Sequence, residues 1–237
     1  MAPVSDDIPE ARRSAPATLR RSPRRSRLIG AGLIGLLALT TAALLSPAGR
    51  RLLAPPPVAG LAARPGLDGR LLGHFPYSEA AAEDLVAFAP GQQLHRDAAP
   101  ALRQMQQAAR ADGIDLVVLS AFRSQAAQNG LFFDVKSERN QSARERAHVS
   151  APPGYSEHST GYALDLGDGS LPASHLSAGF EATPAFAWLQ RNAARFHFQL
   201  SFPPGNGQGV SYEPWHWRFE GTADALRIFE PAHRLAR

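Results

Sequence analysis

The chain has 237 residues, enough for one domain of ordinary size together with an N-terminal extension. It contains no cysteine, which excludes disulfide bonds, thiolate metal sites and a cysteine nucleophile, so any metal must be bound by histidine and carboxylate side chains. The formal net charge of +4 comes from residues 1–27, where seven arginines face three acidic residues. The remaining 18 basic and 18 acidic residues (25 − 7 and 21 − 3) balance, which argues against a nucleic-acid-binding domain.

Residues 1–27 are rich in Arg, Ser, Pro and Ala and contain almost no large apolar residue, so we expect a disordered, basic tail in the cytoplasm. An uncharged segment follows at residues 28–45, just long enough to cross about 30 Å of hydrocarbon as a transmembrane helix. The arginines before it favour a cytoplasmic N-terminus and a domain on the extracytoplasmic side of the cell membrane. The alternative is a signal peptide cleaved near residues 46–48, which would release a secreted protein.

Residues 46–73 include three consecutive prolines and scattered glycines, a composition typical of a stalk, so the domain itself is expected to span residues 74–237. The Ala- and Glu-rich stretch 78–86 predicts a short helix. A longer helix is predicted over residues 97–111, with an aspartate as the expected N-cap and a glycine soon after its end. The apolar run 114–119 is typical of a buried strand.

The second half of the domain also alternates between helical and extended patterns. A helix is predicted over residues 124–139 with serine as N-cap, followed by a loop over 140–155. Thr-Pro predicts the start of a helix over 183–195, and alternating residues predict a strand over 197–202. A final strand over 210–219 contains a proline, so it is expected to be irregular or at an edge, and only one or two amphipathic turns are expected after it.

Two short segments carry residues suited to a metal site, Ser156 to Asp165 and Glu213 to His216. Catalytic zinc usually takes three histidine or carboxylate ligands and keeps a further position for water. His158, Asp165 and His216 are the candidate ligands. Glu213 is a nearby carboxylate that is not a ligand and is the candidate base for the metal-bound water.

Each segment alone also has an ordinary explanation. An isolated histidine is more often a surface or core residue than a ligand, and Asp165 followed by Gly-Asp is often a turn. Gly161 and Ala163, between the first two candidate ligands, would let the backbone pass close to a metal or substrate. A His/Asp/His set also suits divalent metals other than zinc.

Taken together, the two segments resemble the signature of a known family. Ser-x-His-x-x-Gly-x-Ala-x-Asp followed by Glu-Pro-Trp-His-Trp-Arg is similar to the motifs of zinc D-alanyl-D-alanine carboxypeptidases of the VanY type, a group that includes dipeptidases and phage endolysins. The family's third element, aromatic-Arg-Ser followed by Gln, is present as Phe122-Arg123-Ser124 and Gln128. The resemblance covers about residues 75–222.

The resemblance implies an α+β domain of the Hedgehog/D,D-peptidase type, with a small, mainly antiparallel sheet and flanking helices. It implies a Zn²⁺ enzyme that hydrolyses the D-alanyl-D-alanine bond of peptidoglycan stem peptides, with Glu213 as general base. Arg123 is expected to stabilise the oxyanion or bind the peptide carboxylate, and Ser156 and Gln128 to bind substrate; a capping hydroxyl and a surface amide are the alternatives for the last two.

Other functions remain open from the sequence alone. An endopeptidase or a D,D-dipeptidase would use the same metal chemistry. A wall-binding module with a structural zinc is the non-enzymatic alternative, and the presence of Glu213 argues against it.

Overall fold

The computed structural model describes residues 60–235. The predicted basic tail, the apolar segment 28–45 and the first part of the predicted stalk lie outside the described residues. Within residues 60–235, no helix combines the length and the apolar character needed to cross a lipid bilayer.

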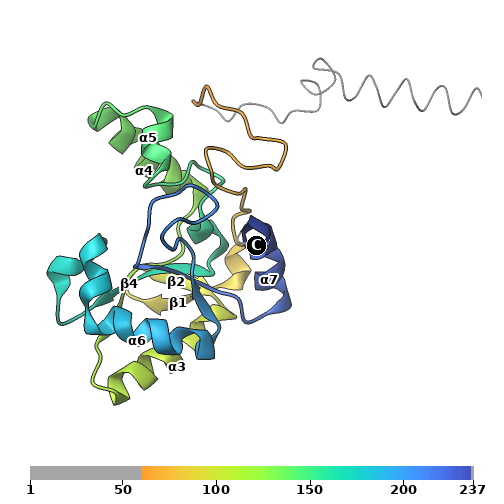
Figure 1. Cartoon of the computed structure of the whole chain (residues 1–237). Coiled ribbons are helices and arrows are strands. Elements are labelled where there is room, and N and C mark those ends of the chain that lie inside the picture. The colour runs from red at the N-terminus through yellow and green to blue at the C-terminus, as the bar shows by residue number, and fades with distance from the viewer. Residues whose placement is uncertain (1–59, 236–237) are drawn as a thin grey trace, which may run out of the picture. The chain divides into compact units, whose positions relative to one another are not determined.

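An antiparallel sheet forms the centre of the domain (Figure 1). It has four strands in the order β3-β4-β6-β5. A separate antiparallel hairpin is made by β1 and β2. The strands are β1 (Leu85–Ala89), β2 (Gln92–His95), β3 (Leu116–Ser120), β4 (Ala163–Asp168), β5 (Phe198–Leu200) and β6 (His216–Phe219). These pairings confirm the expected small, mainly antiparallel sheet.

Helices flank this sheet, as expected for an α+β domain. The α-helices are α3 (Ala98–Ala111), α4 (Gln125–Glu138), α5 (Ala143–Ala147), α6 (Pro184–Asn192) and α7 (Ala223–Leu235). The short 3₁₀ helices are η1 (Ala82–Asp84), η2 (Glu157–Thr160), η3 (Pro172–Ser174), η4 (Ala178–Ala182) and η5 (Ala193–Phe196). Figure 1 shows α3 and α6 together along one side of the sheet, whereas α4 and α5 lie beyond its other side.

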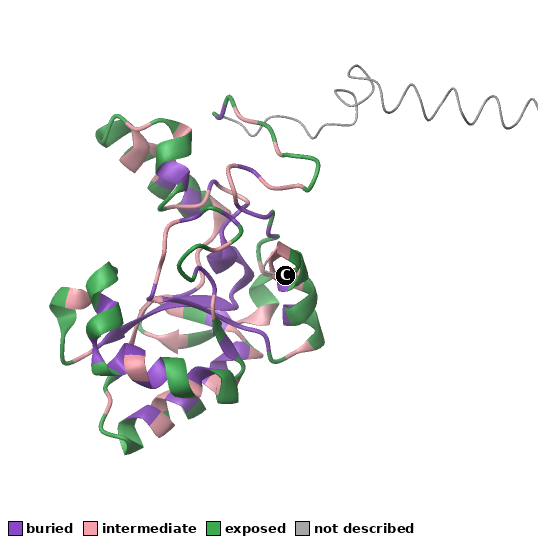
Figure 2. Ribbon diagram, in the orientation of Figure 1, coloured by how far each residue is buried: buried purple, intermediate pink, exposed green. Residues whose placement is uncertain are grey.

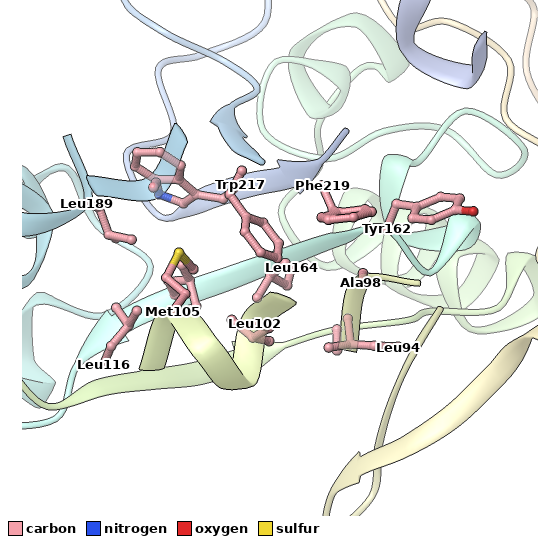
Figure 3. Packing of buried hydrophobic residues seen from close by; sticks show 14 of the residues in the cluster. Leu94, Ala98, Leu102, Met105, Leu116, Tyr162, Leu164, Leu189, Trp217 and Phe219 are labelled. Carbon is pink, nitrogen blue, oxygen red and sulfur yellow. The ribbon is translucent and has the colours of Figure 1, made fainter. Parts of the chain in front are cut away.

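Alternation along β4 and β6 separates the hydrophobic core from the polar face of the sheet. Leu164 and Trp217 pack with Leu102 of α3 in the core cluster (Figure 3). Each fully buried leucine of this kind contributes about 1.5–3 kcal/mol of hydrophobic stabilisation. Because successive side chains of a strand point to opposite faces, Asp165 and His216 lie on the other face. That face is buried as well, so both strands are covered on two sides (Figure 2).

Local sequence signals placed several helix starts correctly. The Ser124 hydroxyl accepts a hydrogen bond from the backbone N–H of Ala127 at 3.1 Å at the start of α4. The Thr183 hydroxyl accepts from the N–H of Phe186 at 3.2 Å at the start of α6. Asp97 precedes α3 as expected, but its carboxylate accepts a hydrogen bond from the Tyr162 hydroxyl at 3.1 Å instead of capping the helix.

The helix predicted over residues 78–86 is wrong. Only η1 is helical there, and the chain then enters β1, which pairs with β2 across a turn at Pro90-Gly91. Gly91 has a φ of +72°, a left-handed conformation that glycine adopts without strain. Strand pairing in the hairpin therefore overrides the helical propensity of the Ala- and Glu-rich stretch.

Three further predictions near the C-terminal half need correction. The segment predicted as a loop over 140–155 contains α5. The final strand begins only at His216 and lies between β4 and β5, so it is not the edge strand that was one of the two expectations. The other expectation was irregular backbone at the proline, and the residues around Pro214 do lie outside any strand. The predicted one or two turns after Gly221 form the 13-residue helix α7.

The described part of the predicted stalk, residues 60–73, packs against the domain. Leu61 and Leu71 are buried in a second apolar cluster with Phe132 of α4 and Ala147 of α5. These residues therefore help to support the helices on the polar side of the sheet.

Candidate metal and active site

The three candidate ligands converge because of strand register and one tight turn. Asp165 of β4 and His216 of β6 are direct cross-strand partners. His158 lies in η2, and the chain returns from η2 into β4 at Gly161. One potential ligand atom from each of His158, Asp165 and His216 lies within 4.8 Å of the other two, and all three residues are buried. The structure therefore brings together the metal ligands predicted from the sequence.

Gly161 is needed at this turn because of its left-handed backbone conformation and its close contact with the β1-β2 hairpin. Its φ is +71°, and a Cβ there would lie 2.9 Å from Leu85 Cδ2 and 3.0 Å from the backbone nitrogen of His95. That nitrogen donates a hydrogen bond to the Gly161 carbonyl at 2.8 Å. The close approach that the structure shows at Gly161 is to the β1-β2 hairpin.

The orientation of His158 is fixed by a backbone carbonyl. Its Nδ1–H donates to the carbonyl of Ala121 at 2.8 Å, which leaves Nε2 facing Asp165 Oδ2 at 3.4 Å. The rings of His158 and His216 are perpendicular, with centroids 4.8 Å apart. A partner on the second ring nitrogen is the usual way in which a metal-binding histidine is held in one tautomer.

His216 is held by a carboxylate that the sequence analysis missed. Its Nδ1 lies 3.1 Å from Asp165 Oδ1, and its Nε2 lies 3.0 Å from Glu157 Oε2. Glu157 is itself buried and accepts hydrogen bonds from Arg218 Nη1 at 2.9 Å and from the Ser201 hydroxyl at 2.6 Å. The available signals were an acidic residue directly before His158 and an arginine in the Trp-His-Trp-Arg motif.

The charges of the cluster suit a cation. Burial would raise the pKa of Asp165, but the neighbouring His158 and His216 outweigh it and hold that pKa well below its usual value. Burial lowers the pKa of His158, which favours the neutral imidazole. Burial opposes charge on His216 too, yet its hydrogen bonds to Asp165 and Glu157 raise its pKa to about 10. A divalent metal bound here would replace that proton, and two imidazoles with one carboxylate form a donor set that fits zinc.

Glu213 is placed beside the cluster by a β-turn. The backbone N–H of His216 donates to the Glu213 carbonyl at 3.1 Å, and Pro214 occupies the second position of the turn, which proline favours. The turn brings Glu213 Oε2 to 3.8 Å from His216 Nδ1. Burial raises the pKa of Glu213 to about 7, a value suited to a group that accepts and returns a proton at neutral pH.

Arg123 follows β3 and faces the same cavity. Its Nη2 donates to the Ser120 hydroxyl and its Nη1 to Gln128 Oε1, both at 2.9 Å. Ser120 is in turn paired with Asp165 across β3 and β4. Burial lowers the pKa of Arg123, although a guanidinium remains charged at any physiological pH. The structure thus fixes a cation next to the candidate metal ligands.

Gln128 and Ser156 occupy the cavity wall in different ways. Gln128 is 1% exposed, and its Nε2 donates to the Ser150 hydroxyl at 3.2 Å and to the Ala151 carbonyl at 2.7 Å. Its amide therefore positions Arg123, which is a different contact from the substrate contact predicted for it. Within residues 60–235 the hydroxyl of Ser156 has no hydrogen-bond partner, so it is available to a ligand.

One cavity of about 370 Å³ contains every predicted site residue. Its polar wall includes Arg123, Gln128, Ser156, His158, Asp165, Glu213 and His216. Apolar residues such as Leu131, Phe202 and Trp215 complete the lining. A cluster of potential ligands, a spare carboxylate and a fixed cation in one cavity are the components of a metal-dependent hydrolase site.

Comparison with known proteins gives the same picture. The family model "VanY: D-alanyl-D-alanine carboxypeptidase" matches residues 91–222, which include all seven predicted site residues. The chain is 34% identical over 144 residues to the putative carboxypeptidase YodJ of Bacillus subtilis (strain 168), covering 57% of this chain and 49% of YodJ. It is 32% identical over 155 residues to a D-alanyl-D-alanine carboxypeptidase of Enterococcus faecalis, covering 62% of this chain and 55% of that protein. The chain therefore spans about half the length of these curated relatives.

Solved structures are similar over a larger share of their length. VanYB in complex with D-alanine-D-alanine has a TM-score of 0.53 and 28% identity, covering 66% of this chain and 87% of that one. A VanY D,D-pentapeptidase variant from a VanB-type cassette, in complex with Zn(II), has a TM-score of 0.52 and 25% identity, covering 69% and 94%. The LD-carboxypeptidase LdcB has a TM-score of 0.51 and 30% identity, covering 65% and 71%.

Proposed function

Because the chain belongs to the VanY family of D-alanyl-D-alanine carboxypeptidases, we propose that it is a zinc-dependent enzyme that releases the terminal D-alanine of peptidoglycan stem peptides. The observation that carries this proposal is the buried cluster of His158, Asp165 and His216 with a separate carboxylate, Glu213, 3.8 Å from His216. The Zn(II) complex of the similar VanY structure supports zinc as the metal.

The residues around the cluster divide the chemistry between them. His158, Asp165 and His216 would hold a zinc ion, which would polarise the scissile carbonyl and lower the pKa of the attacking water. Glu213 accepts the proton of that water and delivers it to the leaving amine of D-alanine. Its pKa of about 7 allows both transfers at neutral pH. Glu157 takes no part in proton transfer and keeps the His216 ring in place.

Arg123 and Ser156 are assigned to the substrate. The guanidinium of Arg123 is held by Ser120 and Gln128 and retains further N–H donors for the terminal carboxylate or for the oxyanion. An anion inside a closed cavity needs such a cation, because an unpaired buried charge is strongly disfavoured. Ser156 offers a hydroxyl to the same end of the peptide.

The decisive experiment compares two stem pentapeptides that differ only at the C-terminus. The peptide ending in free D-Ala-D-Ala is expected to release one D-alanine, whereas its C-terminally amidated form is cut far more slowly, because it lacks the anion that Arg123 binds. The enzyme treated with a chelator is the control and should be inactive on both. Equal cleavage of the two peptides, or preference for a cross-linked dimer, would contradict the carboxypeptidase and favour an endopeptidase.

A second candidate function is L,D-carboxypeptidase activity, which removes D-alanine from a tetrapeptide stem. The specific observation in its favour is the 30% identity to the LD-carboxypeptidase LdcB. Including the tetrapeptide and free D-Ala-D-Ala in the same assay separates the three possibilities. D-alanine release from the pentapeptide alone supports the D,D-carboxypeptidase, release from the tetrapeptide the L,D enzyme, and cleavage of the free dipeptide a D,D-dipeptidase.

The location of the enzyme is a further part of the proposal. We propose that residues 28–45 anchor the chain in the cell membrane, with the domain on the extracytoplasmic side where its wall substrate lies. The basic residues before this segment and its apolar composition support this topology. Full-length protein in the membrane fraction, with a domain sensitive to external protease, is the expected result. A soluble form beginning near Gly49 would favour the cleaved signal peptide.

A further inference from the structure

Two arginines line the active-site cavity outside the metal cluster and have no carboxylate partner within residues 60–235. Arg146 belongs to α5 and Arg139 directly follows α4. Among residues 60–235, no carboxylate lies within the 4.0 Å ion-pair distance of either guanidinium. The other arginine deep in the fold, Arg218, pairs with both Glu157 and Glu220. The cavity therefore contains positive charge that no carboxylate of the described residues pairs with directly.

The guanidinium of Arg146 is also short of hydrogen bonds. Arg146 is only 6% exposed, and its Nη2 donates to the Leu131 carbonyl at 3.3 Å. Its Nε is buried and has no hydrogen-bond partner in the part of the chain that the structure describes. Burial lowers the pKa of Arg146, and the nearby Arg139 adds to this effect. A buried cation with an unsatisfied donor is costly to the folded state unless an anion arrives to pair with it.

Helix stability explains the position of Arg139 but not that of Arg146. A cation after the last turn of α4 interacts favourably with the helix dipole, so Arg139 has a local reason to be there. The carboxylate next to Arg146 in sequence, Glu145, is used in the capping box of α5, where it accepts from the Ser142 N–H at 2.7 Å. Folding of α5 thus leaves Arg146 without a partner inside the cavity wall.

The cavity wall is continuous from Arg123 to Arg146. The Ser150 N–H donates to the Arg146 carbonyl at 3.0 Å, and the Ser150 hydroxyl accepts from Gln128, which holds Arg123. Leu131, which contacts Arg146, lies one turn beyond Gln128 on α4. Arg139 lies farther along, at the C-terminal end of α4, and lines the same cavity. An extended peptide advances about 3.3 Å per residue, so this wall spans several residues of a bound peptide.

We propose that Arg139 and Arg146 form an anion subsite that binds a second carboxylate of the stem peptide, two or three residues before its terminal D-alanine. This inference rests on the proposed function, in which Arg123 binds the terminal carboxylate. Two carboxylates of stem peptides fall in that range. One is on the side chain of the third residue when it is diaminopimelate, and is missing when it is lysine. The other is the free α-carboxylate of the γ-linked D-glutamate.

The test uses pentapeptides in which each of these two carboxylates is either free or amidated, with release of D-alanine as the readout. Amidating the recognised carboxylate is expected to lower kcat/KM by roughly 10- to 100-fold, mainly through KM, as for the loss of a charge-assisted hydrogen bond. The carboxylate whose amidation has this effect identifies the source of the anion. If neither amidation changes kcat/KM while D-alanine is still released, the subsite is overturned and the proposed function stands. If no peptide releases D-alanine, the proposed function fails and the subsite fails with it.

Substitutions in the enzyme provide the second half of the test. Arg139→Gln and Arg146→Gln are expected to reduce the ratio of kcat/KM between the free and amidated peptides toward one. Arg146→Lys keeps the charge and should retain most of the preference. Arg144→Gln is the matched control, because Arg144 lies on the same helix α5, is exposed and lines a different pocket. Arg139 is exposed, so its replacement does not threaten folding. A wild-type ratio of kcat/KM in both Arg139→Gln and Arg146→Gln would overturn the proposal.

Discussion

Glu157 accepts a hydrogen bond from His216 Nε2 at 3.0 Å, on the side of the ring opposite to the nitrogen that faces Asp165. The contact places the Nε2 proton toward Glu157 and leaves Nδ1 as the candidate ligand atom of His216. Glu157 can hold this position because it also accepts hydrogen bonds from Arg218, Ser201 and Tyr77 in a buried environment. The metal cluster therefore depends on a residue that does not belong to it.

The first prediction follows from this dependence. Glu157→Gln keeps the shape of the side chain but removes the charge that pairs with Arg218 and His216, so zinc affinity is expected to fall about 10- to 100-fold. Competition with a chromophoric chelator measures the affinity. Glu220→Gln is a suitable control, because Glu220 also pairs with Arg218 at 2.6 Å but does not contact His216. Wild-type affinity in the Glu157 variant would show that the ring needs no support from it.

The second prediction concerns the metal itself. The purified protein is expected to contain about one zinc per chain, and His216→Ala or Asp165→Asn should lose it because each leaves only two of the three usual protein ligands. Elemental analysis of the purified proteins is the measurement. His197→Gln should keep its zinc, since His197 is exposed and lies outside the cavity. Full activity of the wild-type protein after exhaustive chelation would rule out the metal mechanism.

The third prediction separates proton transfer from metal binding. Glu213→Gln preserves the size of the side chain and removes the proton acceptor, so the variant should retain zinc while kcat falls by roughly 10²-fold or more. Glu138→Gln, at an exposed position in the last turn of α4, serves as the control. Near-normal turnover by the Glu213 variant would mean that another group accepts the proton.

The fourth prediction concerns stability in mild acid. His74 is buried, and its Nε2–H donates to the Ala147 carbonyl at 2.7 Å. Burial lowers the pKa of His74 below its ordinary value of 6.5, so the unfolded chain binds more protons than the folded one below that pH. Stability from the neutral ring is therefore present above pH 6.5 and is lost as the pH falls toward the folded-state pKa.

Urea denaturation of the metal-free protein at several pH values measures this effect. The unfolding free energy of the wild type should fall more steeply below pH 6.5 than that of His74→Gln, with a difference of up to about 1.4 kcal/mol per pH unit. Identical slopes for wild type and His74→Gln would contradict the prediction.

The candidate site residues could be predicted from the sequence because the types and spacing of such residues are restricted by the proposed reaction. Three candidate ligands and a candidate base at this spacing are a rare combination in a sequence. The structure places all four in one cavity, namely His158, Asp165, His216 and Glu213. Glu157 was missed because its role is to orient another side chain, and such a role depends on distant contacts. Its partners Ser201 and Arg218 come from other parts of the chain, and no local pattern links them to it.

The errors in the fold have the same origin. Residues 78–86 are good helix formers, yet β1 forms because Val86 pairs with Leu94 in a hairpin. Only one or two turns were expected after the final strand, but the longer helix α7 brings His233 Nε2 to 2.7 Å from Glu220 Oε2. Local propensity is a weak preference, and tertiary contacts of this kind override it.

The β-turn between Glu213 and His216 also restricts where the chain tolerates insertions and deletions. Only Pro214 and Trp215 separate the base from the ligand, and β6 starts at the ligand. One added residue would shift the register of β6 against β4 and reverse the faces of its side chains, so that Trp217 would point to the cavity and His216 to the core. By contrast, the exposed loop around residues 203–207 can change length at a small entropic cost. Variation in chain length among functional variants should therefore be confined to such loops and be absent from the turn.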